Sequence, residues 1–240
     1  MKQARNETAD GVRTGRYDGG VVVADGREYD IDGDARLLAP CEPSAVYCVG
    51  RNYAETIEQR GYERPDQPTI FIKPPVSVVA PGAPIPYPTF SDEVTYAGEL
   101  AAVIGDRCRH VDAAEASAYV RGYTILNDVD ALDQPGLTER KAFDGSAPLG
   151  PWIETDLDPT AVRMRTVIDG ETRQEASTER MLFDPFELLA FLSSRLTLLP
   201  DDVVSFGSPP NPGLIEPGDE IAITYDGIGT LRNPVSAPPE

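Results

Sequence analysis

The chain has 240 residues, of which 40% are hydrophobic, enough for one large domain with a substantial core. Its 40 acidic residues outnumber its 21 basic ones, and the resulting net charge of −19 argues against binding to nucleic acids or to anionic membrane surfaces. The sequence contains neither a run long enough to span a membrane nor the apolar core of a signal peptide, so we expect a cytoplasmic protein.

Short strands dominate the elements predicted for the first half of the chain. Residues 1–42 predict a small β cap, because glycine turns alternate with β-prone runs such as VVVADGREYDI. The main domain is predicted to cover residues 43–240. It opens with a strand over AVYCVG, a short helix over RNYAETIEQRG that ends at Gly61, and a strand over TIFIKPP. After a proline-rich connection, VTYAGELAAVIG predicts one long buried strand.

The second half continues this pattern with few helices. DAAEASAYVRG and FDPFELLAFLSSRLTLLP predict helices, YTILNDVD a strand, and DQPGLTERKAFDG a loop. VRMRTVIDGETRQEA predicts a hairpin whose turn is Asp-Gly, and further strands close the chain. Many short strands without βαβ alternation predict a mostly-β domain of the α+β class.

The basic residues are strongly biased toward arginine. Lys2, Lys73 and Lys141 are the only lysines among the 21 basic residues. Abundant acid with so little lysine is typical of halophilic proteins, in whose cytoplasm molar salt screens the repulsion between like charges; an acidic protein with biased codon usage is the alternative. A lysine kept in the interior of such a chain is a candidate for a function that arginine cannot perform.

Several catalytic chemistries have no support in this sequence. Three cysteines and one histidine show no zinc-site spacing, and no glycine-rich nucleotide-binding motif occurs. Acid–base or metal chemistry must therefore rest on carboxylates and lysine.

Eight segments, taken in order, resemble the fumarylacetoacetate hydrolase family. They are VGRNY (49–53), FIKPPVSV (71–78), GELAAVIG (98–105), GYTILNDV (122–129), KAFDGSAPLGPW (141–152), DGETRQ (169–174), FGSPPNPG (206–213) and EPGDEIAITYDGIGTLRNPV (216–235). The resemblance implies a rolled, sandwich-like β core, a homodimer, and Mg²⁺ or Mn²⁺ as cofactor. It also implies a small 2-oxo or 2,4-dioxo carboxylic acid as substrate, converted through an enolate that the dication stabilises.

The resemblance implies metal ligands at an E-x-E pair on one strand and at the aspartate of an N-D pair. Glu99 and Asp128 stand at two of these positions, and Ala97 replaces the first glutamate. A strand-end acid that faces solvent is the alternative for Glu99. Asp130 is expected on the same side of its strand as Asp128, where it either supplies the missing oxygen ligand or is one more surface acid.

Two further family positions are altered. Thr56 and Gln59 replace the His and Glu that activate water, and neither can deprotonate water near neutral pH. Leu132 replaces the arginine that the resemblance assigns to gripping a substrate carboxylate.

Other positions of the motifs are retained. Lys141 is expected to be catalytic: it would hold the enolate charge or move a proton, with a pKa lowered by burial and the dication. Lys73 either contacts substrate or forms a structural ion pair. The resemblance also implies substrate binding by Asn52 and Ser208, where serine keeps the hydroxyl of the family's threonine.

Two functions follow from these residues. The first is a metal-dependent lyase, isomerase, decarboxylase or C–C hydrolase acting on a small 2-oxo acid. The alternative is a catalytically silent relative that binds a small acid or serves only as a dimeric binding or structural protein.

Overall fold

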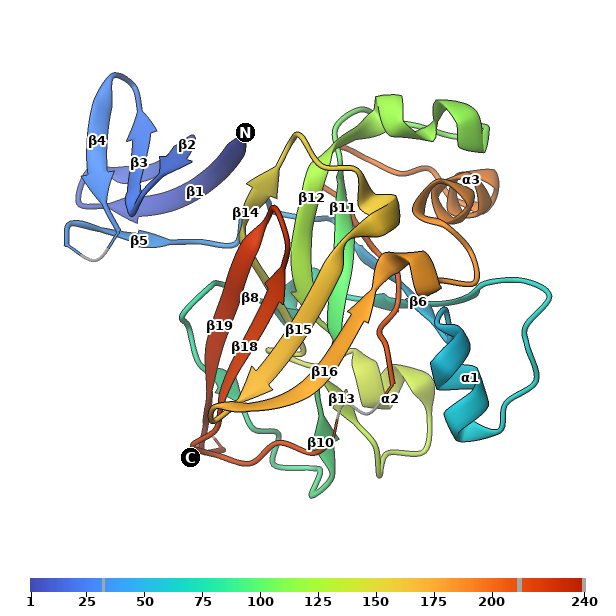
Figure 1. The fold of residues 1–240 in the computed structure, drawn as a ribbon. Coiled ribbons are helices and arrows are strands. Elements are labelled where there is room, and N and C mark those ends of the chain that lie inside the picture. Colours follow the sequence, from blue (N-terminus) through green and yellow to red (C-terminus); the bar gives the residue numbers. More distant parts are fainter. Residues whose placement is uncertain (32, 211–212, 239–240) are drawn as a thin grey trace.

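The computed structural model describes residues 1–31, 33–210 and 213–238. Within them, short strands form three β-sheets, and a few short helices lie beside the sheets (Figure 1). The predicted mostly-β architecture of the α+β class is confirmed. In these ranges no helix combines the length and the apolar character needed to cross a bilayer.

The largest sheet runs through the centre of the molecule. Its strands are β1 (Lys2–Thr8), β2 (Gly11–Asp18), β3 (Val21–Ala24), β4 (Arg27–Asp30), β5 (Ala35–Leu37), β6 (Val46–Gly50), β7 (Thr69–Lys73), β8 (Val78–Val79), β11 (Gly98–Ile104), β12 (Val120–Asn127), β14 (Ala147–Glu154) and β17 (Val203–Ser205). They follow the order β4-β3-β2-β1-β14-β12-β11-β17-β6-β7, with β5 beside β1 and β8 beside β14. All residues of β11 and β14 are buried, which explains their apolar, non-alternating sequences.

Strands β1–β5 project from the main body (Figure 1). They extend the large sheet, because β1 pairs with β14 at Lys2 and Glu154. The Tyr17 ring stacks on Trp152 at 3.9 Å between centroids, and Lys2 Nζ lies 4.8 Å from the centroid of the same indole. The contact between the hairpins and the main body is therefore aromatic as well as hydrogen-bonded.

A second sheet packs against the first. It has the order β16-β15-β18-β19-β9, with strands β9 (Ile85–Pro86), β15 (Arg163–Ile168), β16 (Glu171–Ser177), β18 (Glu220–Tyr225) and β19 (Gly229–Ser236). Asp169 and Gly170 make the predicted Asp-Gly turn, both with positive φ. A Cβ atom at Gly98 would approach side chains of the second sheet to 2.8 Å, so glycine allows the close contact of the two sheets just before Glu99.

The segment VTYAGELAAVIG is not the single strand that its sequence predicts. It forms β10 (Val94–Thr95), which pairs with β13 (Asp130–Ala131), and then β11, which pairs with β12. Between them the Ala97 amide donates to Asn127 Oδ1 at 3.1 Å, and the Gly98 amide donates to Gln174 Oε1 at 3.1 Å. These side-chain acceptors replace a continuous backbone ladder, and the chain changes partners here.

Three α-helices lie within the described ranges: α1 (Ala54–Arg60), α2 (Leu137–Lys141) and α3 (Pro185–Arg195). As predicted, α1 ends at Gly61 in the left-handed region. Helix α3, which was also predicted, begins with a capping box formed by Asp184 and Glu187. The helix expected over DAAEASAYVRG is a 3₁₀ helix instead (Ala113–Tyr119). Helix α2 lies in a segment expected to be a loop. The remaining 3₁₀ helices are Pro75–Ser77, Pro159–Ala161 and Thr178–Arg180.

Candidate active site

A cavity of about 490 Å³ lies beside α1 and α2, where β11 begins and β12 ends. Its polar lining includes Thr56, Glu99, Asp128, Asp130, Lys141 and Ser208. These residues come from five separate segments of the chain and meet at one place. The breaks in strand pairing between β10 and β11 and after β12 lie at this cavity.

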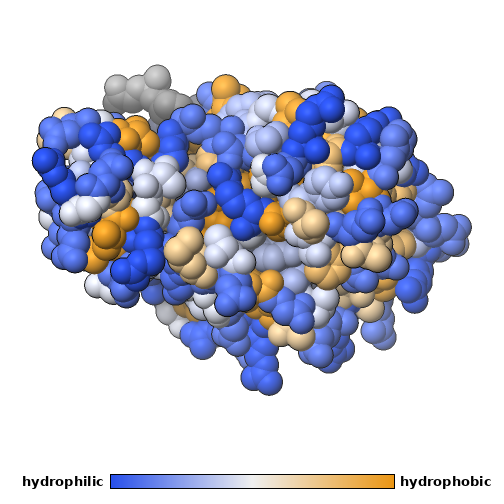
Figure 2. Space-filling view, turned by 90° about the horizontal axis from the view of Figure 1, so that it is seen from above, coloured by the Kyte–Doolittle hydropathy of each residue, from blue (hydrophilic) through white to orange (hydrophobic). Residues whose placement is uncertain are grey.

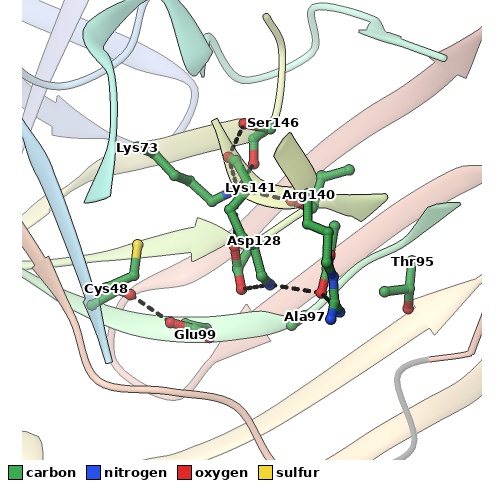
Figure 3. A network of polar contacts seen from close by, with 12 residues as sticks. Cys48, Lys73, Thr95, Ala97, Glu99, Asp128, Arg140, Lys141 and Ser146 are labelled. Carbon is green, nitrogen blue, oxygen red and sulfur yellow. Dashed lines mark hydrogen bonds and ion pairs between the residues drawn. The ribbon is translucent and has the colours of Figure 1, made fainter. Parts of the chain in front are cut away.

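Asp128 is the centre of a buried charge cluster (Figure 3). Lys73 Nζ lies 2.9 Å from Asp128 Oδ1, and Lys141 Nζ donates to Asp128 Oδ2. Burial alone would raise the pKa of Asp128, but Lys141 and Lys73 outweigh it and hold the pKa below its ordinary value. Asp128 is thus a carboxylate at neutral pH.

Lys73 has its ammonium group surrounded by protein oxygens. It donates to the backbone carbonyls of Val129 (2.8 Å), Lys141 (2.8 Å) and Ser146 (2.9 Å), and it is fully buried. With Asp128 beside it, this is the geometry of the structural ion-pair alternative. It ties β7 to the end of β12 and to α2.

Lys141, the last residue of α2, extends its ammonium group to the cavity. Its Nζ lies 3.1 Å from Asp130 Oδ2 and 5.0 Å from the Phe71 ring centroid. Burial would lower the pKa of Lys141, but Asp128 and Asp130 together outweigh it and raise the pKa to about 12. The paired carboxylates thus oppose the lowering expected from burial and hold the proton on the lysine, whereas the lowering expected from a dication stays a prediction.

Asp130 is buried, which rules out the surface-acid alternative. Arg140 binds its carboxylate with two parallel hydrogen bonds, Nε to Oδ1 at 2.8 Å and Nη2 to Oδ2 at 2.6 Å. Arg140 lines the same cavity and was missed by sequence reasoning. Its position directly before Lys141 was the sequence feature that could have indicated it. The sequence did not predict helix α2, which carries both residues.

Glu99 is also buried rather than exposed at a strand end. Its Oε2 accepts hydrogen bonds from the Ser205 hydroxyl and from the Gly207 amide at 3.2 Å. Burial, followed by the negative charge of Asp128, raises the pKa of Glu99 to about 8. Glu99 and Asp128 are therefore two carboxyl groups that repel one another when both are ionised.

The donor chemistry at Glu99 and Asp128 suits a hard dication, because a cation between them would relieve this repulsion. Their oxygens are of the type that Mg²⁺ and Mn²⁺ prefer, but the methyl group of Ala97 offers no third ligand. Among the described residues, no three His, Cys, Asp or Glu side chains come together as a metal site. Arg140 occupies both oxygens of Asp130, and Lys73 and Lys141 each contact one oxygen of Asp128. A dication held by Glu99 and Asp128 would therefore share the Asp128 carboxylate with the two lysines.

The remaining predicted residues divide between the cavity wall and its support. Thr56 and Ser208 line the cavity, and the Thr56 hydroxyl donates to the Ser208 carbonyl at 3.3 Å. The buried Asn52 side chain donates to the carbonyls of Phe183 (3.0 Å) and Phe206 (2.8 Å) and accepts from the Phe183 amide. Asn52 thereby fastens the loop after β17, which carries Ser208. Gln59 is exposed on α1.

Comparison with known families identifies the fold around this cavity. The profile of the fumarylacetoacetate (FAA) hydrolase C-terminal domain matches residues 45–236. The chain belongs to the fumarylacetoacetate hydrolase family. Protein Rv2993c of Mycobacterium tuberculosis is 44% identical over 223 residues, which cover 90% of this chain and 84% of that protein. The mitochondrial oxaloacetate tautomerase Fahd2a of Rattus norvegicus is 34% identical over 83% of this chain and 69% of its own length.

Solved structures of family members share this architecture. The 5-carboxymethyl-2-hydroxymuconate delta-isomerase of Mycobacterium smegmatis is 42% identical and superposes with a TM-score of 0.93 over 100% of both chains. The fumarylpyruvate hydrolase of Pseudomonas aeruginosa, solved with Mn²⁺ and pyruvate, is 29% identical with a TM-score of 0.77, over 85% of this chain and 93% of that chain. Relatives of this protein thus include isomerases, tautomerases and hydrolases of small oxo acids, and at least one binds Mn²⁺.

Proposed function

We propose that this protein converts a small 2-oxo acid through an enolate, as an isomerase, tautomerase or decarboxylase. The observation that carries the proposal is the Lys141 ammonium group, held at the cavity wall by Asp128 and Asp130. Isomerisation and decarboxylation share one requirement, which is the stabilisation of negative charge on the oxygen at C2. A permanently charged ammonium in a buried site meets that requirement.

The cavity residues divide this work among themselves. Lys141 stabilises the enolate oxygen, and Ser208, which lines the same cavity, offers a hydroxyl to the substrate. Lys73 and Asn52 are positioning residues in this scheme, since their polar atoms hold Asp128, α2 and the loop of Ser208. C–C hydrolysis is disfavoured, because Thr56 and Gln59 cannot activate water near neutral pH.

Glu99 and Asp128 are the residues that would hold Mg²⁺ or Mn²⁺. A bound dication would polarise the substrate's carboxylate and 2-oxo group as a Lewis acid. The fumarylpyruvate hydrolase of Pseudomonas aeruginosa was solved with Mn²⁺, which supports a divalent cofactor for this chain. With Ala97 in place of a third carboxylate, we expect weaker binding than a three-carboxylate site provides.

A silent, ligand-binding relative is the second candidate, and the observation in its favour is the loss of three chemical groups at Thr56, Gln59 and Ala97.

We also propose a homodimer. The exposed side chains of Ile72 and Val76, on and just after the edge strand β7, support an apolar contact with a second copy.

A substrate panel separates the two candidates. Purified protein with Mg²⁺ or Mn²⁺ in high salt should convert oxaloacetate or an acylpyruvate, which is measured as a loss of the absorbance of the enol form. Turnover by the wild type supports the proposed enzyme. If the wild type is inactive on the whole panel, while the triple variant Thr56→His, Gln59→Glu, Ala97→Glu is active, the protein is a silent relative.

We propose in addition that the surface is adapted to molar salt. The face in Figure 2 is largely hydrophilic with scattered apolar side chains, the net charge is −19, and none of the three lysines is exposed. Raising KCl from about 0.1 M to 1 M shortens the screening length from about 10 Å to about 3 Å. The melting temperature should therefore rise steeply over that range and on to several molar, and a flat or falling curve would contradict the adaptation.

A further inference from the structure

Arg140 presents a guanidinium group to the cavity from the last turn of α2. Its partner carboxylate, Asp130, is 8% exposed, whereas the Arg140 side chain is 31% exposed. The pair is therefore anchored on its aspartate side and open on its arginine side. Asp130 fixes the plane of the guanidinium through the two parallel hydrogen bonds at 2.8 and 2.6 Å.

Part of this guanidinium remains available for a ligand. Of its five N–H groups, the two parallel bonds to Asp130 use one on Nε and one on Nη2. In the part of the chain that the structure describes, Nη1 donates to no residue. The edge of the guanidinium that carries Nη1 and the second Nη2 proton has the fork shape that matches a carboxylate.

The position of Arg140 relative to Lys141 sets the size of such a ligand. Asp130 Oδ2 accepts from Arg140 Nη2 at 2.6 Å and lies 3.1 Å from Lys141 Nζ, so the two cations flank one oxygen atom. Figure 3 shows both side chains reaching the same region. A molecule a few carbons long can have its reacting oxygen at Lys141 and its far end at Arg140.

The cavity that Arg140 lines also has apolar side chains in its wall. Leu132 and Leu137 line the same cavity and bring no charge. Asp130 neutralises Arg140, but the ion pair leaves donors without acceptors, and a second carboxylate would satisfy them in a site partly shielded from water.

We propose that Arg140, oriented by Asp130, binds a second carboxylate of the substrate and makes the site selective for 2-oxo dicarboxylic acids over 2-oxo monocarboxylic acids. This inference rests on the proposed function for the reaction itself, but it predicts binding independently of turnover. Arg140 is a specificity residue in this scheme, and Asp130 is its positioning residue.

Two matched pairs of compounds test the proposal. The first pair is a substrate pair, oxaloacetate and acetylpyruvate, which differ in whether a carboxylate or a methyl ketone lies at the far end. The second is a binding pair, 2-oxoglutarate and 2-oxovalerate, measured by calorimetry. Arg140→Gln should raise the KM for oxaloacetate and the Kd of 2-oxoglutarate by about 10- to 100-fold. The values for acetylpyruvate and 2-oxovalerate should change by less than about threefold.

Arg121→Gln is the matched control. Arg121 is also 31% exposed and also pairs with an aspartate, Asp201, but it lies near the start of β12, whereas Asp128 follows the end of that strand. This variant should leave the preference for dicarboxylates unchanged. Because Arg140→Gln removes a partner from a buried carboxylate, the double variant Asp130→Asn, Arg140→Gln and the variant Arg140→Lys are measured with it. The double variant should lose the preference, and lysine should restore only part of it, since it lacks the planar fork.

The outcomes separate this inference from the proposed function. Wild type that turns over no 2-oxo acid, but prefers 2-oxoglutarate in an Arg140-dependent way, overturns the proposed function and supports the role of Arg140. Wild type that is active, with Arg140→Gln affecting both members of each pair equally or neither, supports the proposed function and overturns the role of Arg140.

Discussion

Replacement of Asp128 by asparagine should destabilise the protein by about 3–5 kcal/mol and abolish binding of Mg²⁺ or Mn²⁺. The carboxylate is the shared partner of Lys73 and Lys141, of which Lys73 is fully buried. Without it, the Lys73 ammonium loses its counter-charge in a site that water reaches poorly, and Lys141 keeps only Asp130. Chemical denaturation and metal calorimetry, both in high salt, measure the two effects.

The decrease of the free energy of unfolding at acid pH provides a second measurement of the role of Asp128. The pKa of Asp128 is lower in the folded protein than its ordinary value, so its contribution is present above the unfolded pKa and lost as pH falls through the folded pKa. The stability of Asp128→Asn should therefore decrease less as the pH falls. Asp201→Asn is the control, because its partner Arg121 and Asp201 itself are partly exposed, and its effect should stay below about 1 kcal/mol. Unchanged stability and unchanged metal binding in Asp128→Asn would place the ion elsewhere and remove Asp128 from the centre of the site.

Lys141→Met should reduce turnover of a 2-oxo acid by about 100-fold or more, since it removes the charge that stabilises the enolate. Lys141→Arg keeps a positive charge but is bulkier, and we expect an intermediate rate from it. Because Asp128 and Asp130 raise the pKa of Lys141 to about 12, the ammonium stays charged throughout the neutral and mildly alkaline range. Deprotonation of Lys141 should therefore produce no loss of activity between about pH 7 and 10.

Lys2→Met is the control for this experiment, because Lys2 lies over the Trp152 ring in the N-terminal hairpins. It should leave turnover unchanged. The rate of loss of enol absorbance and the melting temperature are measured together for each variant. Normal turnover in a well-folded Lys141→Met protein would show that the ammonium group is not part of the chemistry.

Much of the fold could be predicted from local sequence. The β-rich class, the turn at Asp169 and Gly170, and the end of α1 at Gly61 all follow from short-range patterns and are confirmed. Helix α2 could not be predicted in the same way, because it has five residues without an apolar periodicity and lies between a proline-glycine pair and a glycine. Lys73 holds this helix by donating to the carbonyl of its last residue, a tertiary contact that no local pattern encodes.

The arrangement of the cavity depended on the same non-local contacts. Glu99, Asp128, Asp130, Lys141 and Ser208 could be selected as candidates by resemblance, and their roles stay predictions. The sequence could not indicate that the chain changes strand partners at Ala97 and Gly98, where the side chains of Asn127 and Gln174 accept backbone hydrogen bonds. Nor could it indicate that Arg140 turns toward Asp130, since their pairing requires α2 to pack beside β13.

The placement of the three lysines has a consequence for how the protein can be marked after synthesis. Lys73 and Lys141 are buried, and Lys2 is half-buried over Trp152, so none of the three is exposed. Apart from the Met1 ammonium group, the exposed basic groups are mainly guanidinium groups, which lysine acetylation and lysine ubiquitination do not use. An acyltransferase or ubiquitin ligase would find no exposed lysine amine on the folded chain. Modification of Lys73 or Lys141 would require unfolding around the cavity, which leaves the half-buried Lys2 as the lysine that such an enzyme could reach in part.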